Sequence, residues 1–170
     1  MSEVIHEIDM KEELVFSELD HICIVTKDLD KNIRYYESLG IGPFKPIGPV
    51  ERFDFKMLMH GKSIAPDSYK VEPRIARVGL VKIELVQPIS GNSLWQEFLE
   101  TRGEGIMHLA FKVDDVEKEE GKLVKNGLEL IFHVRFRTSK GCGGVSYFDT
   151  RKVGGVIFEI VQWAPGMILV

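Results

Sequence analysis

Short apolar runs, separated by polar and glycine- or proline-rich turns, divide the chain into strands and a few helices. The run 19–25 is rich in β-branched and other apolar residues and ends in the polar segment 26–28, which predicts a strand. Helical spacing follows, because one face collects Leu29, Ile33, Tyr36 and Leu39. Asp28 suits the N-cap of this helix, and Gly40 suits the position just after its end.

The same patterns predict two further helices and several more strands. Helices are expected over 93–100 and 116–126, and strands over 74–78, 81–86, 106–113, 128–137, 145–149 and 156–162. The segment 42–74 carries five of the seven prolines and is predicted to be loop-rich, with one strand-like run, Arg52–Leu58. Tyr69 and Lys70 in this segment are candidate substrate contacts, and the pattern is equally compatible with a variable surface loop.

One strand–helix–glycine unit occurs twice. Shifting the sequence by 87 residues aligns four identical pairs: His21 with His108, Asp28 with Asp115, Lys31 with Lys118 and Gly40 with Gly127. Several strands follow in each copy, so the unit is a βαβββ module, and two such modules can bury their sheet faces together. The sequence therefore predicts an α+β fold. The expected boundaries are an N-terminal extension 1–17, a first βαβββ module 18–91, a linker helix 92–104, a second βαβββ module 105–163 and a tail 164–170.

Each repeat places a histidine at the head of its first strand and a glutamate in its last strand. These residues are His21 and Glu84 in the first copy and His108 and Glu159 in the second. A carboxylate flanked by apolar residues is normally paired, neutralised or bound to a metal, because burying it alone costs several kcal/mol. Taken singly, each has an ordinary alternative: a hydrogen-bonded histidine, or a glutamate facing solvent at a sheet edge. Their symmetric repetition favours a divalent-metal site, and the mixed N/O donors favour Mg, Mn, Fe, Co, Ni or Zn.

Composition and charge narrow the classes of partner. The chain has 170 residues, 44% of them hydrophobic and 28% charged, as in an average soluble domain, and its net charge of −4 argues against nucleic acid. The sequence shows no apolar run long enough to span a membrane and no basic-then-apolar signal pattern at its start. The two cysteines, Cys23 and Cys142, suggest neither a disulfide framework nor a CxxC metal site. We expect a cytoplasmic protein whose partner is a small molecule.

Four segments resemble the vicinal-oxygen-chelate superfamily, which includes glyoxalase I, methylmalonyl-CoA epimerase, extradiol dioxygenases and bleomycin-resistance proteins. They are Leu19–Val25, Arg34–Gly40, Gly105–Phe111 and Gly154–Glu159. The resemblance implies that the paired modules form a curved mixed sheet, the glyoxalase-like fold. It also implies a divalent metal (Co, Mn, Ni, Zn or Mg) and a homodimer. The family's four metal positions carry over to His21, Glu84, His108 and Glu159.

Within the superfamily, the chain looks most similar to methylmalonyl-CoA epimerase. Epimerases commonly have Gln at the second metal position, so Glu84 is a departure shared with glyoxalases. Glyoxalase I typically holds glutathione with an Arg and an Asn where this chain has Val25 and Pro88, which argues against that substrate. Extradiol dioxygenases use two histidines and one carboxylate in a longer chain, so that activity is less expected.

The function that the resemblance implies is an isomerase or epimerase that acts through an enolate on a small acyl-CoA or related oxygen-chelating substrate. Glu159 is the candidate catalytic residue, and the second acid/base is left open between Glu51, Asp67 and Glu72. The basic residues Arg135, Arg137 and Lys140 either receive an anionic group or form a solvated strand end. The alternatives are a non-catalytic binding protein of the resistance type, or a glyoxalase-type lyase with a non-glutathione substrate.

Overall fold

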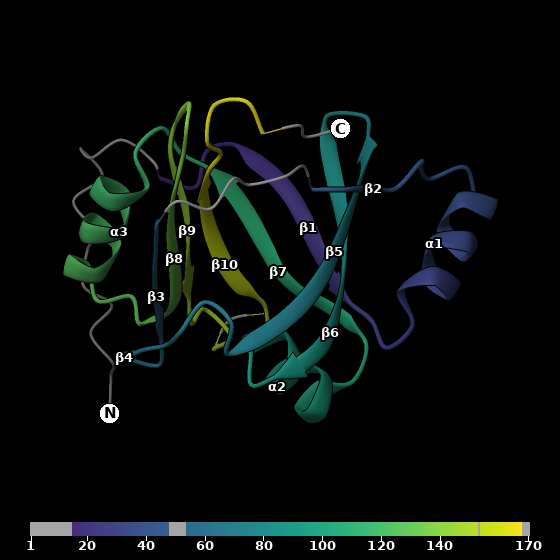
Figure 1. Cartoon of the computed structure of the whole chain (residues 1–170), viewed down its shortest axis with the longest axis horizontal. Helices are drawn as coiled ribbons and strands as arrows, with labels where there is room; N and C mark the ends of the chain where they lie inside the picture. Colours follow the sequence, from purple (N-terminus) through teal and green to yellow (C-terminus); the bar gives the residue numbers. More distant parts are fainter. Residues whose placement is uncertain (1–14, 48–53, 153, 168–170) are drawn as a thin grey trace.

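The fold of this chain was determined as a computed structural model, which describes residues 15–47, 54–152 and 154–167. These residues form ten strands and three helices (Figure 1). In chain order the elements are β1 (Leu19–Val25), α1 (Leu29–Ser38), β2 (Lys45–Pro46), β3 (Asp54–Met59), β4 (Lys62–Ser63), β5 (Tyr69–Val78), β6 (Val81–Gly91), α2 (Leu94–Arg102), β7 (Gly105–Lys112), α3 (Val116–Lys125), β8 (Leu130–Thr138), β9 (Gly141–Phe148) and β10 (Ile157–Gln162).

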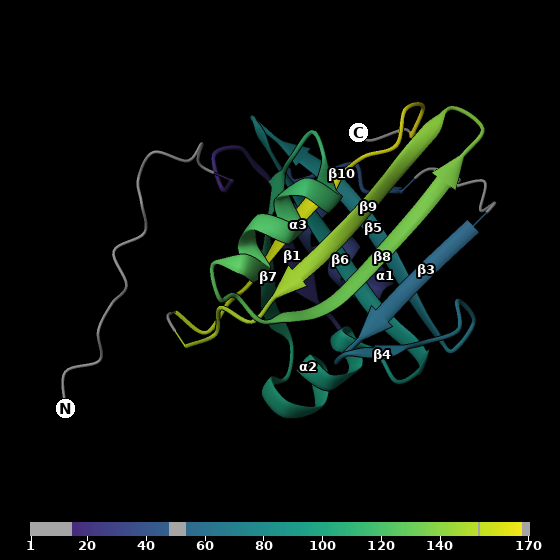
Figure 2. The same cartoon turned by 90° about the vertical axis from the view of Figure 1, so that its left-hand side faces the viewer.

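All the strands belong to one mixed sheet with the order β2-β5-β6-β1-β7-β10-β9-β8-β3-β4. The two halves of the chain meet where β1 pairs antiparallel with β7, and each of these strands has a parallel partner, β6 and β10 respectively. The sheet curls, with α1 outside one end and α3 outside the other (Figures 1 and 2). The predicted α+β class, with a curved mixed sheet of the glyoxalase type, is confirmed.

The two repeats begin their helices in the same way. Asp28 and Asp115 each accept a hydrogen bond from the backbone N–H three residues later, at 3.0 Å in both cases, which confirms the expected N-cap at Asp28. Gly40 and Gly127 follow the helix ends with φ of +82° and +86°, a region where glycine carries no steric cost. The repeat found in the sequence is therefore a repeat of backbone structure.

The segment 42–74 contains more strand than its prolines predicted. β5 already begins at Tyr69 and runs through Pro73, and β6 continues through Pro88 to Gly91. In these stretches the two strands pair only with each other among the described residues, so one side of each strand has no neighbouring strand to receive an N–H donor. Proline is tolerated on such an edge, which is why it did not end either strand.

The strand expected at Arg52–Leu58 is observed as β3, although residues 52 and 53 lie outside the described residues. β3 comes from the first half of the chain but pairs with β8 of the second half, from Asp54 opposite Arg137 to Met59 opposite Phe132. The two halves therefore share strands.

Apolar clusters on both sides of the sheet hold this arrangement together. The largest lies inside the curl and includes Cys23, Trp95, Met107 and Phe132. Two smaller clusters lie outside, one beneath α1 around Leu29 and Leu85, the other beneath α3 around Val116 and Ile160. Helices α1 and α3 thus cover the outer face, whereas α2 packs against the inner cluster, where the site is built.

Among the described residues, the helices are too short or too polar to cross a membrane.

Candidate metal centre

The four candidate ligands lie on four adjacent strands in the middle of the sheet. His21 is on β1, His108 on β7, Glu84 on β6 and Glu159 on β10. The register is the same in both halves, because each glutamate lies two residues beyond the residue paired with its own histidine. Side chains alternate along a strand, so this offset keeps each glutamate on the same face as the residue paired with its histidine.

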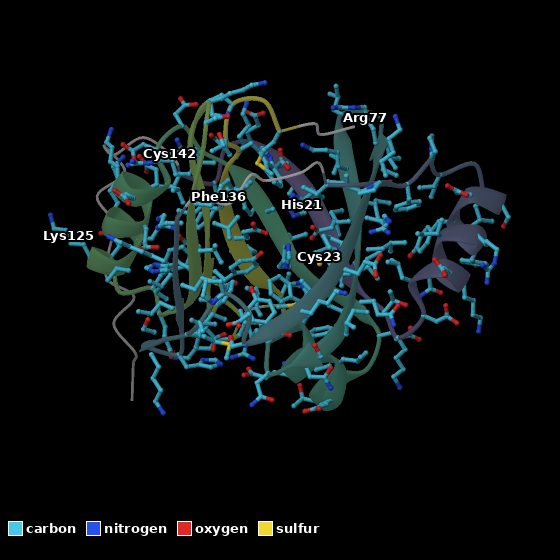
Figure 3. All side chains as sticks on the ribbon, in the orientation of Figure 1. His21, Cys23, Arg77, Lys125, Phe136 and Cys142 are labelled. Carbon is cyan, nitrogen blue, oxygen red and sulfur yellow. The ribbon has the colours of Figure 1, made fainter. Side chains whose placement is uncertain are left out.

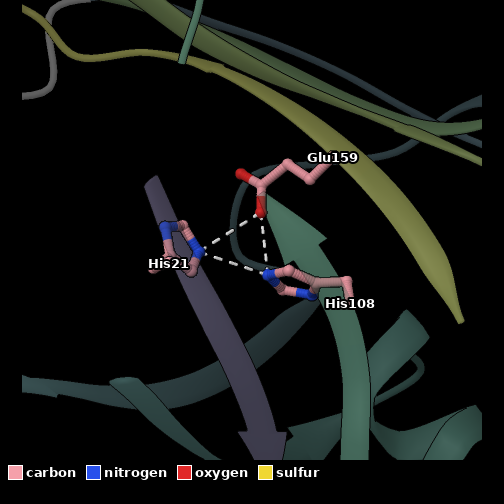
Figure 4. A group of neighbouring side chains, drawn as sticks. All are labelled: His21, His108 and Glu159. Carbon is pink, nitrogen blue, oxygen red and sulfur yellow. Dashed lines mark hydrogen bonds and ion pairs between the residues drawn. The ribbon is translucent and has the colours of Figure 1, made fainter. Parts of the chain in front are cut away.

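The side chains converge on one point, and Figure 4 shows three of them, His21, His108 and Glu159. The Nε2 atoms of His21 and His108 are 3.3 Å apart. Glu159 Oε2 lies 2.8 Å from His108 Nε2 and 3.4 Å from His21 Nε2. Glu84 Oε2 lies 3.6 Å from His21 Nε2 and 3.7 Å from His108 Nε2. The structure therefore brings together all four residues that the sequence selected.

This cluster is buried and incompletely hydrogen-bonded. The exposed fractions are 1% for His21, 0% for His108, 8% for Glu84 and 1% for Glu159. Within the described part of the chain, neither Glu159 Oε2 nor His108 Nδ1 has a hydrogen-bond partner of acceptable geometry. Unsatisfied buried polar groups are rare and costly, whereas two imidazole nitrogens and two carboxylates directed at one point are a suitable donor set for a divalent cation. The residues present fit such an ion.

The electrostatics of the cluster favour positive charge at its centre. Burial raises the pKa of Glu159, but the charges and close contacts of His108 and His21 outweigh it and hold that pKa at about 2. Burial lowers the pKa of His21, but the hydrogen bond to Asp20 and the neighbouring carboxylates raise it to about 10. The Glu159 carboxylate is therefore ionised and stabilises a cation placed between the ligand atoms.

Asp20 orients His21 from the side opposite the cluster. Asp20 Oδ2 lies 2.9 Å from His21 Nδ1, while Asp20 Oδ1 accepts hydrogen bonds from Lys82 Nζ at 2.8 Å and Trp163 Nε1 at 3.2 Å. Burial raises the pKa of Asp20, but the hydrogen bonds from His21 and Lys82 lower it to about 2. When Nδ1–H donates to this carboxylate, Nε2 presents its lone pair to the cluster, as in carboxylate–histidine–metal arrangements.

Asp20, Lys82 and Trp163 also belong to the site, although they are not among the residues predicted from the sequence. Two signals were available: Asp20 is adjacent to His21, and Lys82 interrupts an apolar strand on the same face as Glu84. Trp163 follows the end of β10 and reaches Asp20 only through the tertiary fold, so no local pattern could have indicated it.

Two further ionisable groups border the cluster. The thiol of Cys23 is buried, and burial together with the nearby Glu84 carboxylate raises its pKa well above the ordinary value. The ring of Tyr147 contacts that of His108 edge-on, with centroids 5.1 Å apart. Burial and the charges of Glu159 and Glu84 raise the pKa of Tyr147 well above its usual range, so its phenol is neutral.

The cluster forms part of the wall of a cavity of about 780 Å³ inside the curled sheet. His21, Glu84 and Glu159 line this cavity, and Phe136 lines it from β8 (Figure 3). Tyr69 and Lys70 also line it, so the structure places both candidate substrate contacts on the cavity wall, although they belong to β5 and not to a loop. A largely apolar pocket with a few convergent polar groups is the usual form of a small-molecule site.

The three candidates for a second acid/base occupy different places. Asp67 lines the cavity. Glu72 does not, and its carboxylate forms an ion pair with Arg74 at 2.6 Å. Glu51 lies outside the described residues. The structure therefore favours Asp67 over Glu72.

The basic group Arg135, Arg137 and Lys140 does not line this cavity in the described part of the chain. Arg135 Nη2 lies 2.5 Å from Glu120 Oε2 and donates to Ser146 Oγ at 3.0 Å. Glu120 belongs to α3, so Arg135 serves to attach that helix to the outer face of the sheet.

Known proteins share both the sequence pattern and the fold. The uncharacterized protein YqjC of Bacillus subtilis strain 168 is 26% identical over 147 residues, which cover 85% of this chain and 91% of that protein. The methylmalonyl-CoA epimerase of Mycobacterium tuberculosis is 25% identical with a TM-score of 0.63, and the likeness covers 92% of this chain and 95% of the epimerase. A variant epimerase from Streptomyces coelicolor, solved with 2-nitronate-propionyl-CoA, has a TM-score of 0.60 over 86% of this chain and 96% of its own. Its identity of 21% shows the shared fold alone.

A family model matches residues 20–145 of the chain, well over half of its length. The match includes β1 with His21, β6 with Glu84 and β7 with His108, and it ends before Glu159 on β10. It confirms the family predicted from the sequence. The chain belongs to the glyoxalase/bleomycin resistance protein/dioxygenase superfamily.

Proposed function

We propose that this protein is a divalent-metal-dependent isomerase or epimerase that acts on a small acyl-CoA or a related oxygen-chelating substrate. The observation that carries the proposal is the convergence of His21, Glu84, His108 and Glu159 on one point beside the 780 Å³ cavity. The likeness to the Mycobacterium tuberculosis epimerase, over nearly all of both chains, supports the choice of reaction.

The four ligand residues would hold the ion, which would be Co, Mn, Ni, Zn or Mg. When bound, it supplies positive charge that stabilises negative charge developing on a substrate oxygen. The apolar residues of the cavity wall, among them Val134 and Phe136, bind the acyl portion and exclude water. Asp20 keeps the His21 ring in the orientation that binding requires.

Epimerisation requires two proton-transfer groups on opposite faces of the carbon next to the carbonyl. Glu159 is ionised at neutral pH and lies on the cavity wall, so it would accept the proton on one face once its carboxylate is no longer a ligand. Asp67 lies on the same cavity wall but on a different segment, between β4 and β5, and exchanges the proton on the other face. Glu159→Gln and Asp67→Asn should each abolish epimerisation.

The metal is tested by elemental analysis of the purified protein beside His108→Ala. We expect near-stoichiometric divalent metal in the parent and its loss in the variant. His60→Ala is the matched control, because His60 contacts Glu97 at 3.0 Å on the surface and should keep the metal. A parent protein that takes up none of Mn, Co, Ni, Zn or Mg would refute the proposed mechanism.

The reaction is tested by proton exchange at the α-carbon of methylmalonyl-CoA in heavy water, followed by NMR. Exchange should require the metal, fall in Asp67→Asn and persist in Glu72→Gln, since Glu72 lies off the cavity. A metal-loaded protein that binds acyl-CoA without exchange would instead be a ligand-binding protein of the resistance type. Exchange with a 2-keto substrate alone would point to the glyoxalase-type lyase.

The expected homodimer, cytoplasmic location and module boundaries remain predictions. Analytical ultracentrifugation over a range of concentrations tests the first of these.

A further inference from the structure

Cys23 lies next to the proposed metal ligands, on the same strand as His21. It follows His21 by two residues on β1 and is 0% exposed. In the strand register it is paired with Glu84 on one side and with His108 on the other. Figure 3 shows Cys23 beside His21 in the middle of the molecule, whereas Cys142 lies at the periphery.

Its sulfur completes a second group of ligand atoms. Cys23 Sγ, a carboxylate oxygen of Glu84 and a ring nitrogen of His108 all lie within 4.8 Å of one another. His21, His108 and Glu159 meet the same criterion, so His108 belongs to both groups. Of this second group, Glu84 lines the cavity, whereas Cys23 and His108 are not among its lining residues and lie on its buried side.

Two unpartnered polar atoms surround this second group. The imidazole of His108 is fully buried, and its Nδ1 has no hydrogen-bond partner among the described residues. The indole of Trp95 is 7% exposed and packs in the same apolar cluster as Cys23, and its N–H is also without a partner there. An N–H donor packed in the same cluster as a cysteine is suited to stabilise a metal-bound thiolate.

We propose that Cys23, Glu84 and His108 form a second, buried ligand set that binds thiophilic divalent cations such as Zn, Co or Cd. The inference rests on the proposed metal function of the cluster. Soft thiolate ligands select such ions, whereas Mg and Mn prefer oxygen donors. Because the two sets share His108, and Glu84 lies within 3.7 Å of both histidines, an ion in the buried set withdraws donors from the cavity-facing set. The cluster thereby discriminates between metals: Mg and Mn are confined to the cavity-facing set, whereas Zn and Co can also enter the buried set.

The test is the absorption spectrum of the apoprotein titrated with Co²⁺. Visible d–d bands report that the ion is bound, and a near-ultraviolet sulfur-to-cobalt charge-transfer band reports a thiolate ligand. We expect both in the parent protein. Cys142→Ser is the matched control and should keep both, whereas Cys23→Ser should lose the charge-transfer band and keep the d–d bands.

The parent and the Cys142→Ser variant decide the question even if the buried substitution prevents folding. Bound Co²⁺ with d–d bands but no charge-transfer band in the parent overturns the buried set and leaves the proposed metal site intact. A charge-transfer band that disappears in Cys142→Ser also overturns it. Failure of the parent to bind Co²⁺ at all refutes the inference together with the proposed function.

Discussion

The two halves of the chain agree in the residues that form the metal cluster and differ in how those residues are supported. Each half supplies a histidine from its first strand and a glutamate two residues beyond that histidine's strand partner. Each half also caps its helix alike: Gln87 Oε1 accepts from Leu29 N at 2.9 Å, and Gln162 Oε1 accepts from Val116 N at 3.0 Å.

The support for the two histidines is unequal. His21 is anchored through Asp20, Lys82 and Trp163, whereas His108 Nδ1 has no partner in the described residues and the His108 ring contacts that of Tyr147. The ligand positions are therefore the same in both halves. The orientation of the His21 ring is fixed by a hydrogen-bonded carboxylate, whereas no such partner fixes the His108 ring in the described residues.

Helices α1 and α3 also differ in the contacts that attach them to the sheet. In α1, Ile33 packs against the apolar cluster below the helix, while the equivalent position in α3 is Glu120, which contacts Arg135 and Ser146. Both helices bury apolar residues, but α3 adds charged hydrogen bonds at this position, so the two halves should respond differently to pH.

The largest effect is expected from the two glutamates. Glu159 is 1% exposed and lies 2.8 Å from His108, whereas Glu84 is 8% exposed with contacts of 3.6 and 3.7 Å. Glu159→Gln removes a proton-transfer group and should lower the exchange rate by about 10²- to 10⁴-fold. Glu84→Gln retains a ligand oxygen and should lower it less, in a comparison of single-turnover exchange rates. Equal losses in both variants would contradict the distinct role given to Glu159.

The support of His21 is tested by Lys82→Met. Without Lys82 the buried Asp20 carboxylate loses its 2.8 Å partner and orients His21 less firmly. Loss of such a partner typically weakens metal binding by about 10- to 100-fold, which competition with a chelator will measure. Lys112→Met is the control, because Lys112 is a half-exposed lysine that contacts an exposed glutamate at 3.4 Å. An unchanged affinity in Lys82→Met would show that His21 needs no such anchor.

The attachment of α3 should depend on pH. Burial raises the pKa of Glu120, but Ser146, Arg135 and His133 outweigh it and hold that pKa below the ordinary value. Because the pKa is lower in the folded state, the stabilisation is complete above the unfolded pKa of about 4.3 and disappears as the pH falls through the folded value.

Glu120→Gln should therefore reduce the free energy of unfolding by about 1.5–3 kcal/mol near pH 7, with a smaller deficit near pH 4, as measured by urea denaturation. Ile33→Val in α1 serves as the comparison and should show the same deficit at both pH values. A deficit in Glu120→Gln that does not shrink on acidification would argue against the charged attachment.

The smallest effect concerns the helix interiors. Arg34 and Gly121 are related by the 87-residue shift and occupy the middle of α1 and α3, respectively. A Cβ added at Gly121 would meet nothing within 4 Å. Gly121→Ala should raise the free energy of unfolding by about 0.5–1 kcal/mol, and Arg34→Gly should lower it by a similar amount. Thermal unfolding of both variants will show whether a glycine at this position lowers the free energy of unfolding equally in the two helices.

The cluster could be predicted because its members repeat in register. His21 and His108 align at a shift of 87 residues, and Glu84 and Glu159 are carboxylates within apolar strands. The repeat of the histidines is periodic and the apolar flanks of the glutamates are local, so both can be recognised from the sequence alone. The lengths of β5 and β6 were predicted less well, because whether Pro73 or Pro88 ends a strand depends on which side of it has a neighbour.

By itself, the sequence determined the two modules, their helix caps and the four ligand candidates, because periodicity and capping act over a few residues. Only the tertiary structure decided that β3 joins β8, that Asp67 and not Glu72 reaches the cavity, and that Lys82 and Trp163 meet at Asp20. It also decided that Cys23 lies between Glu84 and His108. These contacts join residues far apart in the chain, and the register of neighbouring strands, which sets them, is fixed by the packing of the whole sheet.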